Sequence, residues 1–239
     1  MLSKLRTLIK RAEWKMLPFH RKSYSQCGED LILSAILKNL GILQPWYVDI
    51  GANDPVVYNN TYLFYRRGSS GILIEPNPQL AKKLRLKRSR DIVIEAGIGA
   101  QAGTLPFFVM RNNVLSTFSE DEKDRLVAMG FALDHQMEVP IMTISDVFEQ
   151  TGKHPIDVLS LDTEGLDLEI LTSIDYKTAV RPKIICVEPR QIGREREQEY
   201  PIHTFLRAKN YIIAAHTPVN TIFVDAAYDQ VDTYTSPRS

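Results

Sequence analysis

Carboxylate side chains stand directly after two apolar runs of the sequence. Asp162 and Glu164 follow residues 157–161 (DVLSL), and Glu188 follows residues 183–187 (KIICV). A carboxylate held beside a hydroxyl can take up its proton as a general base. We therefore predict the base of a reaction at a hydroxyl among Asp162, Glu164 and Glu188. The alternative is that these carboxylates orient a cationic ligand or cap the next helix.

Two further apolar runs end in residues suited to binding a ligand. Gly51 follows residues 46–50 (WYVDI), and Glu75 follows the apolar residues 71–74 (GILI). A glycine lets the backbone turn sharply and lets a ligand approach the main chain. A carboxylate at Glu75 can accept hydrogen bonds from two neighbouring ribose hydroxyls. An ordinary tight turn flanked by solvated acids would give the same pattern.

The loop after the first run indicates which cofactor would fit. It reads Gly-Ala-Asn-Asp at residues 51–54 and lacks the Gly-x-Gly-x-x-Gly spacing that holds a pyrophosphate. Asp49 and Asp54 would also repel phosphate groups. S-adenosylmethionine has ribose and adenine but a cationic, phosphate-free end, so it suits this site better than NAD, and NAD-dependent oxidoreduction is disfavoured.

A metal ion is an alternative cofactor. Mg²⁺ prefers oxygen ligands, and Asp162, Glu188 and Asn220 could supply them. The histidines show no spacing typical of metal ligands, and we assign no metal. His216, after a strand near the C-terminus, is an alternative base.

These residues can meet only if the runs before them lie side by side in one sheet. Short apolar stretches alternate with helical ones from residue 46 onward, which is typical of βαβ units and a parallel sheet. We expect strands at 46–50, 71–75, 92–95, 104–109, 138–143, 157–161 and 183–187, and helices at 59–67, 78–87, 119–130, 145–150 and 201–209. Strands at 211–215 and 220–224 are close enough to form an antiparallel hairpin. Ligands of such sheets bind at the carboxyl ends of the strands.

Composition excludes several classes of protein. The 239 residues are 44% hydrophobic, with 29 Lys+Arg and 29 Asp+Glu, which excludes global disorder and argues against a wholly nucleic-acid-binding surface. Cys186 lies in an apolar run and Cys27 is far from it in sequence. Two reduced thiols and a cytoplasmic protein are therefore expected.

The first 22 residues differ from the rest. They carry seven Lys/Arg and one Glu, a net charge of 7 − 1 = +6, so residues 23–239 carry −6. Leu2, Leu5, Ile9, Ala12 and Met16 recur at helical spacing and predict a basic amphipathic helix. Such a helix can lie on the inner face of an anionic membrane. It could instead pack on this protein or on a second subunit of a homo-oligomer. No transmembrane run or secretory signal is predicted.

A second basic stretch, residues 82–90, holds six cations among nine residues. The simplest interpretation is a solvated helix face. It could also meet a phosphorylated acceptor or RNA.

Four motifs occur in order along the chain: SYSQCGED (23–30), VDIGAN (48–53), GILIEPNP (71–78) and LSLDTEG (159–165). Together they resemble the FkbM family of S-adenosylmethionine-dependent methyltransferases. The resemblance implies an α/β class I (Rossmann-like) fold with a seven-stranded, mostly parallel sheet and a C-terminal antiparallel hairpin. It implies O-methylation of a hydroxyl, most often on a sugar of a glycan or glycan precursor, as in polysaccharide biosynthesis. We expect a basic N-terminal helix (1–22), a methyltransferase domain (23–225) and a polar tail (226–239).

The resemblance also assigns cofactor-binding residues. Asp49, Gly51 and Asn53 would border the methionine part, and Glu75 would hold the ribose. Glu95 would lie near the adenine amino group. The N-terminal element would cover the cofactor with three side chains: Gln26, Glu29 and Asp30.

The sequence does not identify the acceptor. Residues 110–137 and 190–200 are expected to determine specificity, and Tyr58, Asn59, Asn60 and Asn112 are candidates for acceptor contacts. Rival interpretations are an RNA methyltransferase and a catalytically silent binding module that keeps the fold.

Overall fold

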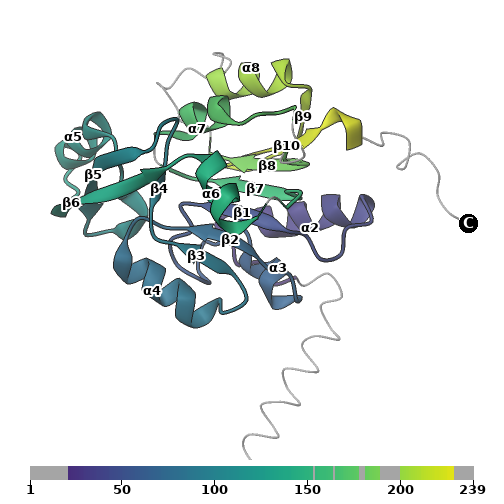
Figure 1. The fold of residues 1–239 in the computed structure, drawn as a ribbon, viewed down its shortest axis with the longest axis horizontal. Coiled ribbons are helices and arrows are strands. Elements are labelled where there is room, and N and C mark those ends of the chain that lie inside the picture. The colour runs from purple at the N-terminus through teal and green to yellow at the C-terminus, as the bar shows by residue number, and fades with distance from the viewer. Residues whose placement is uncertain (1–20, 153, 164, 178–180, 189–199, 229–239) are drawn as a thin grey trace, which may run out of the picture.

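The computed structural model describes residues 21–152, 154–163, 165–177, 181–188 and 200–228. Within them, the main sheet has seven strands in the order β3-β2-β1-β7-β8-β10-β9 (Figure 1). In that order the strands span Ile92–Ile94, Gly71–Ile74, Tyr47–Ile50, Val158–Leu161, Ile184–Val187, Thr221–Asp225 and Tyr211–His216. The first five are parallel, and β10 is antiparallel to β8 and β9. This confirms the predicted class I methyltransferase fold with its C-terminal hairpin.

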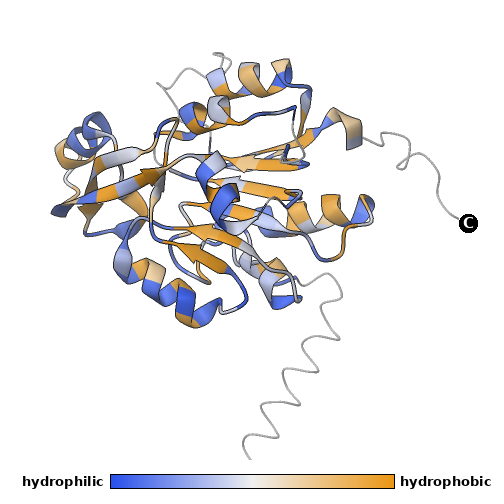
Figure 2. Ribbon diagram, in the orientation of Figure 1, coloured by the Kyte–Doolittle hydropathy of each residue, from blue (hydrophilic) through white to orange (hydrophobic). Residues whose placement is uncertain are grey.

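Helices cover both faces of the main sheet. On one face lie α2 (Glu29–Asn39), α3 (Tyr62–Arg66) and α4 (Pro78–Lys87), and on the other lie α6 (Ile144–Thr151), α7 (Asp167–Ser173) and α8 (Pro201–Ala208). Strands β1, β2, β7 and β8 are buried at every position. They are largely apolar in Figure 2, as a sheet covered on both faces requires.

The order of the strands shows where a ligand should bind. From β1 the chain proceeds outward through β2 and β3, and it later returns to the other side of β1 with β7 and then β8. The crevice outside the carboxyl ends of β1 and β7 is therefore the switch point at which such folds bind ligands.

A second, three-stranded sheet lies between β3 and β7 in the chain, at the left in Figure 1. It consists of β4 (Gly97–Ile98), β6 (Leu133–Met142) and β5 (Gly103–Met110), with the 3₁₀ turn η1 (Asn113–Leu115) and helix α5 (Glu120–Ala128) in the connection from β5 to β6. The strands expected at 104–109 and 138–143 are present but longer. The first half of β6 is mostly exposed. Its apolar pattern therefore could not predict the full length of the strand.

Helix α4 has the predicted bounds, but the basic stretch that includes it is not a uniformly solvated face. Arg88 is fully buried and pairs with Asp91 at 2.7 Å. Arg85 pairs with Glu95 at 2.8 Å at the surface. Two of the six cations are therefore structural partners of acids on or beside β3.

Both cysteines are free thiols, with Cys186 buried as predicted and Cys27 exposed. The helix predicted at residues 1–22 falls almost wholly outside the described residues, as does the tail beyond the 3₁₀ turn η2 (Ala226–Tyr228). Within the described part of the chain, no helix combines the length and apolar content that crossing a bilayer requires.

Candidate active site

A cavity of about 530 Å³ opens at the carboxyl ends of the parallel strands. Its volume lies in the range of roughly 300–1,000 Å³ that small-molecule sites occupy. The wall includes six residues singled out from the sequence: Gln26, Gly51, Asn53, Glu75, Asp162 and Glu188. They come from an N-terminal segment and from the ends of β1, β2, β7 and β8, so the topology brings together residues that are distant in the sequence.

Gly51 sets the floor of the cavity. Its φ is +81°, and a Cβ at this position would lie 1.9 Å from the carbonyl oxygen of Asp162. The backbone N–H groups of Gly51 and Ala52 both donate to the carbonyl of Ile74 at the end of β2. The turn after β1 is therefore packed against the ends of both neighbouring strands, and only glycine fits there.

Glu75 is buried yet borders the cavity. Its carboxylate accepts hydrogen bonds from the backbone N–H groups of Asn53 and Asn77, each at 2.8 Å. Burial raises the pKa of Glu75 to about 7, although these two hydrogen bonds oppose the shift. The side chain is thus held by its flanking loops and titrates near neutral pH.

Asp162 and Glu188 border the cavity from adjacent strands, β7 and β8. The Glu188 side chain is half-buried, and burial, with a smaller contribution from Asp167, raises its pKa. Asp167, which sequence reasoning missed, accepts hydrogen bonds from the backbone N–H and hydroxyl of Thr163, each at 3.0 Å. It thereby shapes the loop after β7. Glu164, the third carboxylate predicted here, lies outside the described residues.

Two predicted cofactor residues are placed elsewhere. Asp49 is absent from the cavity wall, is buried within β1 and accepts a 2.7 Å hydrogen bond from Thr61. Glu95 is also absent from the wall and pairs with Arg85 at the surface. Asp49 lies on the face of β1 opposite to that of Ile50, because side chains alternate along a strand, and it is Ile50 that borders the cavity.

Only one of the three N-terminal residues borders the cavity. Gln26 does so, whereas Glu29 and Asp30 are fully buried at the start of α2. Asp30 accepts hydrogen bonds from the backbone N–H of Tyr24 and the hydroxyls of Ser23 and Ser25. Glu29 accepts one from the backbone N–H of Cys27 at 2.8 Å. The two acids therefore fold the segment that presents Gln26.

The second sheet supplies a wall that the sequence did not predict. Phe107, Phe118 and Ile98 form an apolar side of the cavity, and Asn113–Ser116 form its rim. Gly97 was the one sequence feature that could have indicated this wall, because a Cβ at Gly97 would lie 2.5 Å from the Phe118 ring. Val57 and Tyr58, 56% and 62% exposed, also line the cavity.

Comparison with known families gives a direct result. The sequence of residues 49–213 matches the methyltransferase FkbM domain. The chain belongs to the FkbM methyltransferase family. The matched residues begin within β1 and end within β9, so they include every residue of the cavity wall except Gln26. No curated protein matched the sequence.

Three solved structures resemble this FkbM domain in fold. One is methyltransferase FkbM from Methylobacillus flagellatus KT, at 14% identity and TM-score 0.47, covering 76% of this chain and 44% of that one. A TehB-like SAM-dependent methyltransferase from Corynebacterium glutamicum ATCC 13032 has 8% identity and TM-score 0.43, covering 93% and 99%. Monomeric WbdD has 10% identity and TM-score 0.46, covering 90% and 44%. The chain thus spans less than half the length of the first of these proteins.

Two further predictions for this FkbM domain were His216 as an alternative base and a metal ion as an alternative cofactor. His216 is not in its wall, and its Nδ1 lies 3.1 Å from the Thr221 hydroxyl. Among the described residues, no three His, Cys, Asp or Glu side chains are grouped as metal ligands would be.

Proposed function

We propose that the protein transfers a methyl group from S-adenosylmethionine to a sugar hydroxyl of a glycan or glycan precursor. One observation carries this proposal. The described cavity wall holds four carboxylates, from Asp54, Glu75, Asp162 and Glu188, and no Lys, Arg or His. Such a wall favours a cationic cofactor and disfavours phosphate groups.

The residues present fit each part of S-adenosylmethionine. Glu75 has its carboxylate at the end of β2, where it can accept hydrogen bonds from the ribose hydroxyls. The apolar side formed by Ile98, Phe107 and Phe118 suits the adenine ring. When bound, S-adenosylmethionine supplies a methyl group already activated by its sulfonium.

The chain's own groups must then align the acceptor oxygen and remove its proton. Asp162 and Glu188 stand on adjacent strands at the cavity. Burial raises the pKa of Glu188 above its ordinary value, which makes it a stronger base than an ordinary carboxylate. We assign the base to this pair, with Glu188 as the proton acceptor and Asp162 beside it orienting the acceptor or the cofactor.

The rim indicates a neutral acceptor. Val57, Tyr58 and Val114 line the cavity and are exposed, and Asn113 lines it as well. A sugar ring combines an apolar C–H face, which packs on an aromatic ring, with hydroxyls that asparagine can bind. RNA and phosphorylated acceptors fit less well because the described wall offers no cation.

Two measurements test the proposal. Calorimetry should show S-adenosylmethionine binding to the wild type, and weaker but measurable binding to Asp162→Asn and Glu188→Gln, because each substitution removes one carboxylate from the wall. Incubation with labelled S-adenosylmethionine and a panel of glycan precursors, followed by mass spectrometry, should give a methylated sugar. Glu188→Gln should lower the rate by about 10²–10⁴-fold. Absent cofactor binding would identify a silent binding module, and methylation of RNA alone would overturn the sugar acceptor.

A further inference from the structure

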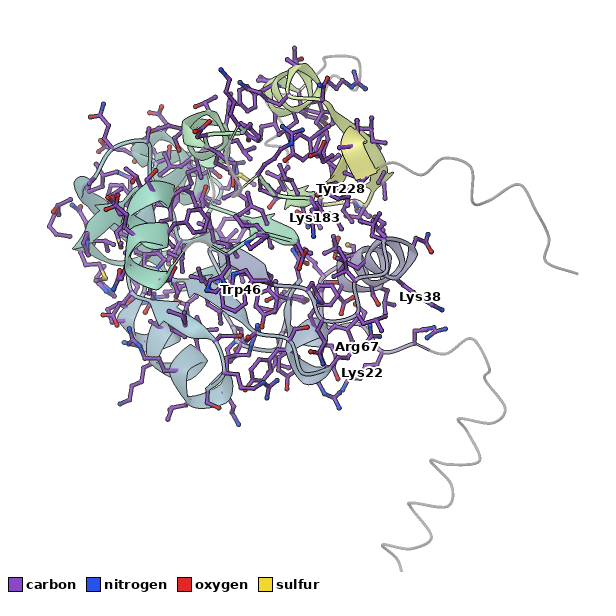
Figure 3. All side chains as sticks on the ribbon, turned by 45° about the vertical axis from the view of Figure 1, so that its right-hand side comes forward. Lys22, Lys38, Trp46, Arg67, Lys183 and Tyr228 are labelled. Carbon is purple, nitrogen blue, oxygen red and sulfur yellow. The ribbon has the colours of Figure 1, made fainter. Side chains whose placement is uncertain are left out.

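Exposed basic side chains gather on the outer surface of α2 and α3. We call this set the α2–α3 cationic face: Arg21, Lys22, Lys38, Arg66, Arg67 and Arg90. Figure 3 shows Lys22, Lys38 and Arg67 on one side of the molecule. Among the described residues, ion pairs join other cations to acids but none involves these six.

Contacts between neighbouring elements hold this face together. The Lys22 ammonium lies 4.9 Å from the centre of the Tyr24 ring, and Arg66 donates a hydrogen bond to the hydroxyl of the same tyrosine. Arg67 donates a 2.5 Å hydrogen bond to Ser34, one helical turn before Lys38 on α2. The six cations therefore share one surface and are not scattered.

Acidic side chains that could neutralise this face are missing from its own elements. Residues 21–48 contain only Glu29 and Asp30 as acids, and both are fully buried. Residues 55–74 contain no acid. The elements that form the face therefore present positive charge alone to solvent, which attracts an anionic partner.

The sequence that precedes the face, outside the described residues, is also basic. Residues 1–20 precede Arg21 and carry five Lys/Arg and one Glu, a net charge of 5 − 1 = +4. Their apolar residues recur at helical spacing, as described above. Positive charge and an apolar stripe thus adjoin the α2–α3 cationic face through the chain itself.

We propose that the α2–α3 cationic face and residues 1–20 together dock the protein on an anionic phospholipid surface. A bilayer offers negative headgroups to the cations and an apolar boundary to the stripe. Leu43, 75% exposed in the loop after α2, adds an apolar side chain beside the face, because its neighbour Gln44 lies next to Gly68 after α3.

The same surface suits single-stranded RNA less well. RNA-binding surfaces use open aromatic rings on which bases stack. The rings nearest these cations are Tyr24 and Tyr65, which are 8% and 9% exposed and already lie against Arg66 and Arg90. The partly exposed Tyr62 ring is itself packed against Tyr24 and Tyr65, with centroids 4.9 Å and 6.1 Å away, so this part of the described surface has no open aromatic platform.

Docking through this face leaves the cavity accessible. Helices α2 and α3 end beside the starts of β1 and β2, whereas the cavity lies at the opposite ends of these strands. The acceptor would therefore enter from the aqueous side.

Vesicle co-sedimentation of the full chain tests the proposal. Vesicles of phosphatidylcholine alone are compared with vesicles containing about 30% phosphatidylglycerol, at about 0.05 M and about 0.5 M salt. Lys38→Gln/Arg67→Gln removes two charges from the face, and Leu5→Gln/Ile9→Gln disrupts the stripe. Lys82→Gln/Lys83→Gln is the matched control, because it removes two exposed charges from α4. S-adenosylmethionine binding is measured on the same samples and is expected to be unchanged.

The wild type should bind only the anionic vesicles, and more weakly at high salt. Lys38→Gln/Arg67→Gln should weaken binding about tenfold or more, and the stripe variant should weaken it similarly, whereas the control should stay within about twofold. Equal binding by the face and control variants, or no vesicle binding at low salt, would overturn the proposal. Binding of a single-stranded RNA oligonucleotide without vesicle binding would assign the face to RNA instead. The vesicle result holds whether or not the proposed methyl transfer is correct.

Discussion

Thr217, in the turn between β9 and β10, donates a 2.6 Å hydrogen bond to Glu29 at the start of α2, 188 residues earlier in the chain. This bond closes the N-terminal segment onto the C-terminal hairpin, and the same segment presents Gln26 to the cavity. Burial raises the pKa of Glu29. The hydrogen bonds from Thr217 and from the Cys27 backbone lower it and outweigh burial, so the net pKa is below its ordinary value.

Thr217→Val should therefore destabilise the protein by about 1–3 kcal/mol at neutral pH, because it removes a hydrogen bond to a charged group. A carboxylate with a lowered pKa contributes stability that is lost as the pH falls. The difference from wild type in the free energy of unfolding, measured with urea, should narrow as the pH falls below 4.5, the value from which the Glu29 pKa is lowered. Thr104→Val, at an exposed threonine on β5, is the control; equal effects of the two substitutions would contradict a role for this bond.

Glu75 should make both cofactor affinity and stability depend on pH. Its pKa of about 7 is raised from an ordinary 4.5, so the folded state holds an extra proton between these values. Without cofactor, the free energy of unfolding should fall as the pH rises from about 4.5 to about 7, by up to about 3 kcal/mol. The affinity for S-adenosylmethionine should instead rise as the pH rises, because the ribose hydroxyls donate to the ionised carboxylate of Glu75.

Calorimetry between pH of about 6 and about 8 measures this dependence, which should approach tenfold in affinity per pH unit below about 7. Glu75→Gln should bind more weakly and without that slope. A slope retained in Glu75→Gln would show that another group titrates.

Arg88 should be the most costly cation to remove. It donates to Asp91 at 2.7 Å and to Asn59 Oδ1 and the Pro55 carbonyl in the loop that follows β1. Arg88→Met leaves Asp91 buried without its cation, which costs about 3–5 kcal/mol. Arg85→Met, whose pair with Glu95 is exposed, should cost no more than about 1 kcal/mol. Urea unfolding compares them, and similar losses would refute the assignment.

Tyr58 holds a backbone conformation that favours glycine, with φ of +56°. Neighbouring hydrogen bonds enforce it, because Asp54 accepts the N–H groups of Val56 and Val57 and Asn59 donates to the carbonyls of Ala52 and Asp54. Tyr58→Gly should raise the melting temperature, since relief of such strain is worth about 1 kcal/mol. Tyr58→Ala keeps the strained backbone conformation and should not raise the melting temperature.

Both Tyr58 variants should raise the KM for the acceptor severalfold, whereas Tyr58→Phe should not, because the ring face rather than the hydroxyl forms the rim. Their affinity for S-adenosylmethionine should match wild type. An unchanged acceptor KM in Tyr58→Ala would exclude this rim from acceptor binding.

Much of the fold follows from the sequence because buried parallel strands are short, apolar and ended by polar residues. The runs before Gly51, Glu75, Asp162 and Glu188 were recognisable for that reason, and the four residues do meet at one cavity. Helix α2 was not predicted, because its apolar residues continue into the following loop without a clear break.

Side-chain direction explains the remaining differences. Asp49 was assigned to the cofactor from its place in a motif, but one position along β1 decides whether a side chain meets the cavity or the buried face. Arg88 looked like one more solvated cation because a run of six cations does not show which side chain is buried, and its partner Asn59 is 29 residues away in the sequence. Phe107 lies on a strand that was predicted, but nothing in the sequence indicated that this strand borders the cavity, and Phe118 lies in the loop before α5, outside any strand.

The second sheet borders the cavity, and Phe107, Val109 and Val139 of its two long strands form a hydrophobic cluster of their own. Its strands pair among themselves, and β5 and β6 share no ladder with the seven-stranded sheet. Residue changes, insertions or deletions in the segment Asn113–Ser116 can therefore alter one wall of the cavity without replacing Phe107 and Phe118, which we assign to the adenine. The fold separates the evolution of acceptor choice from that of the chemistry, and chimeras that exchange only this segment are a practical way to transfer specificity between relatives.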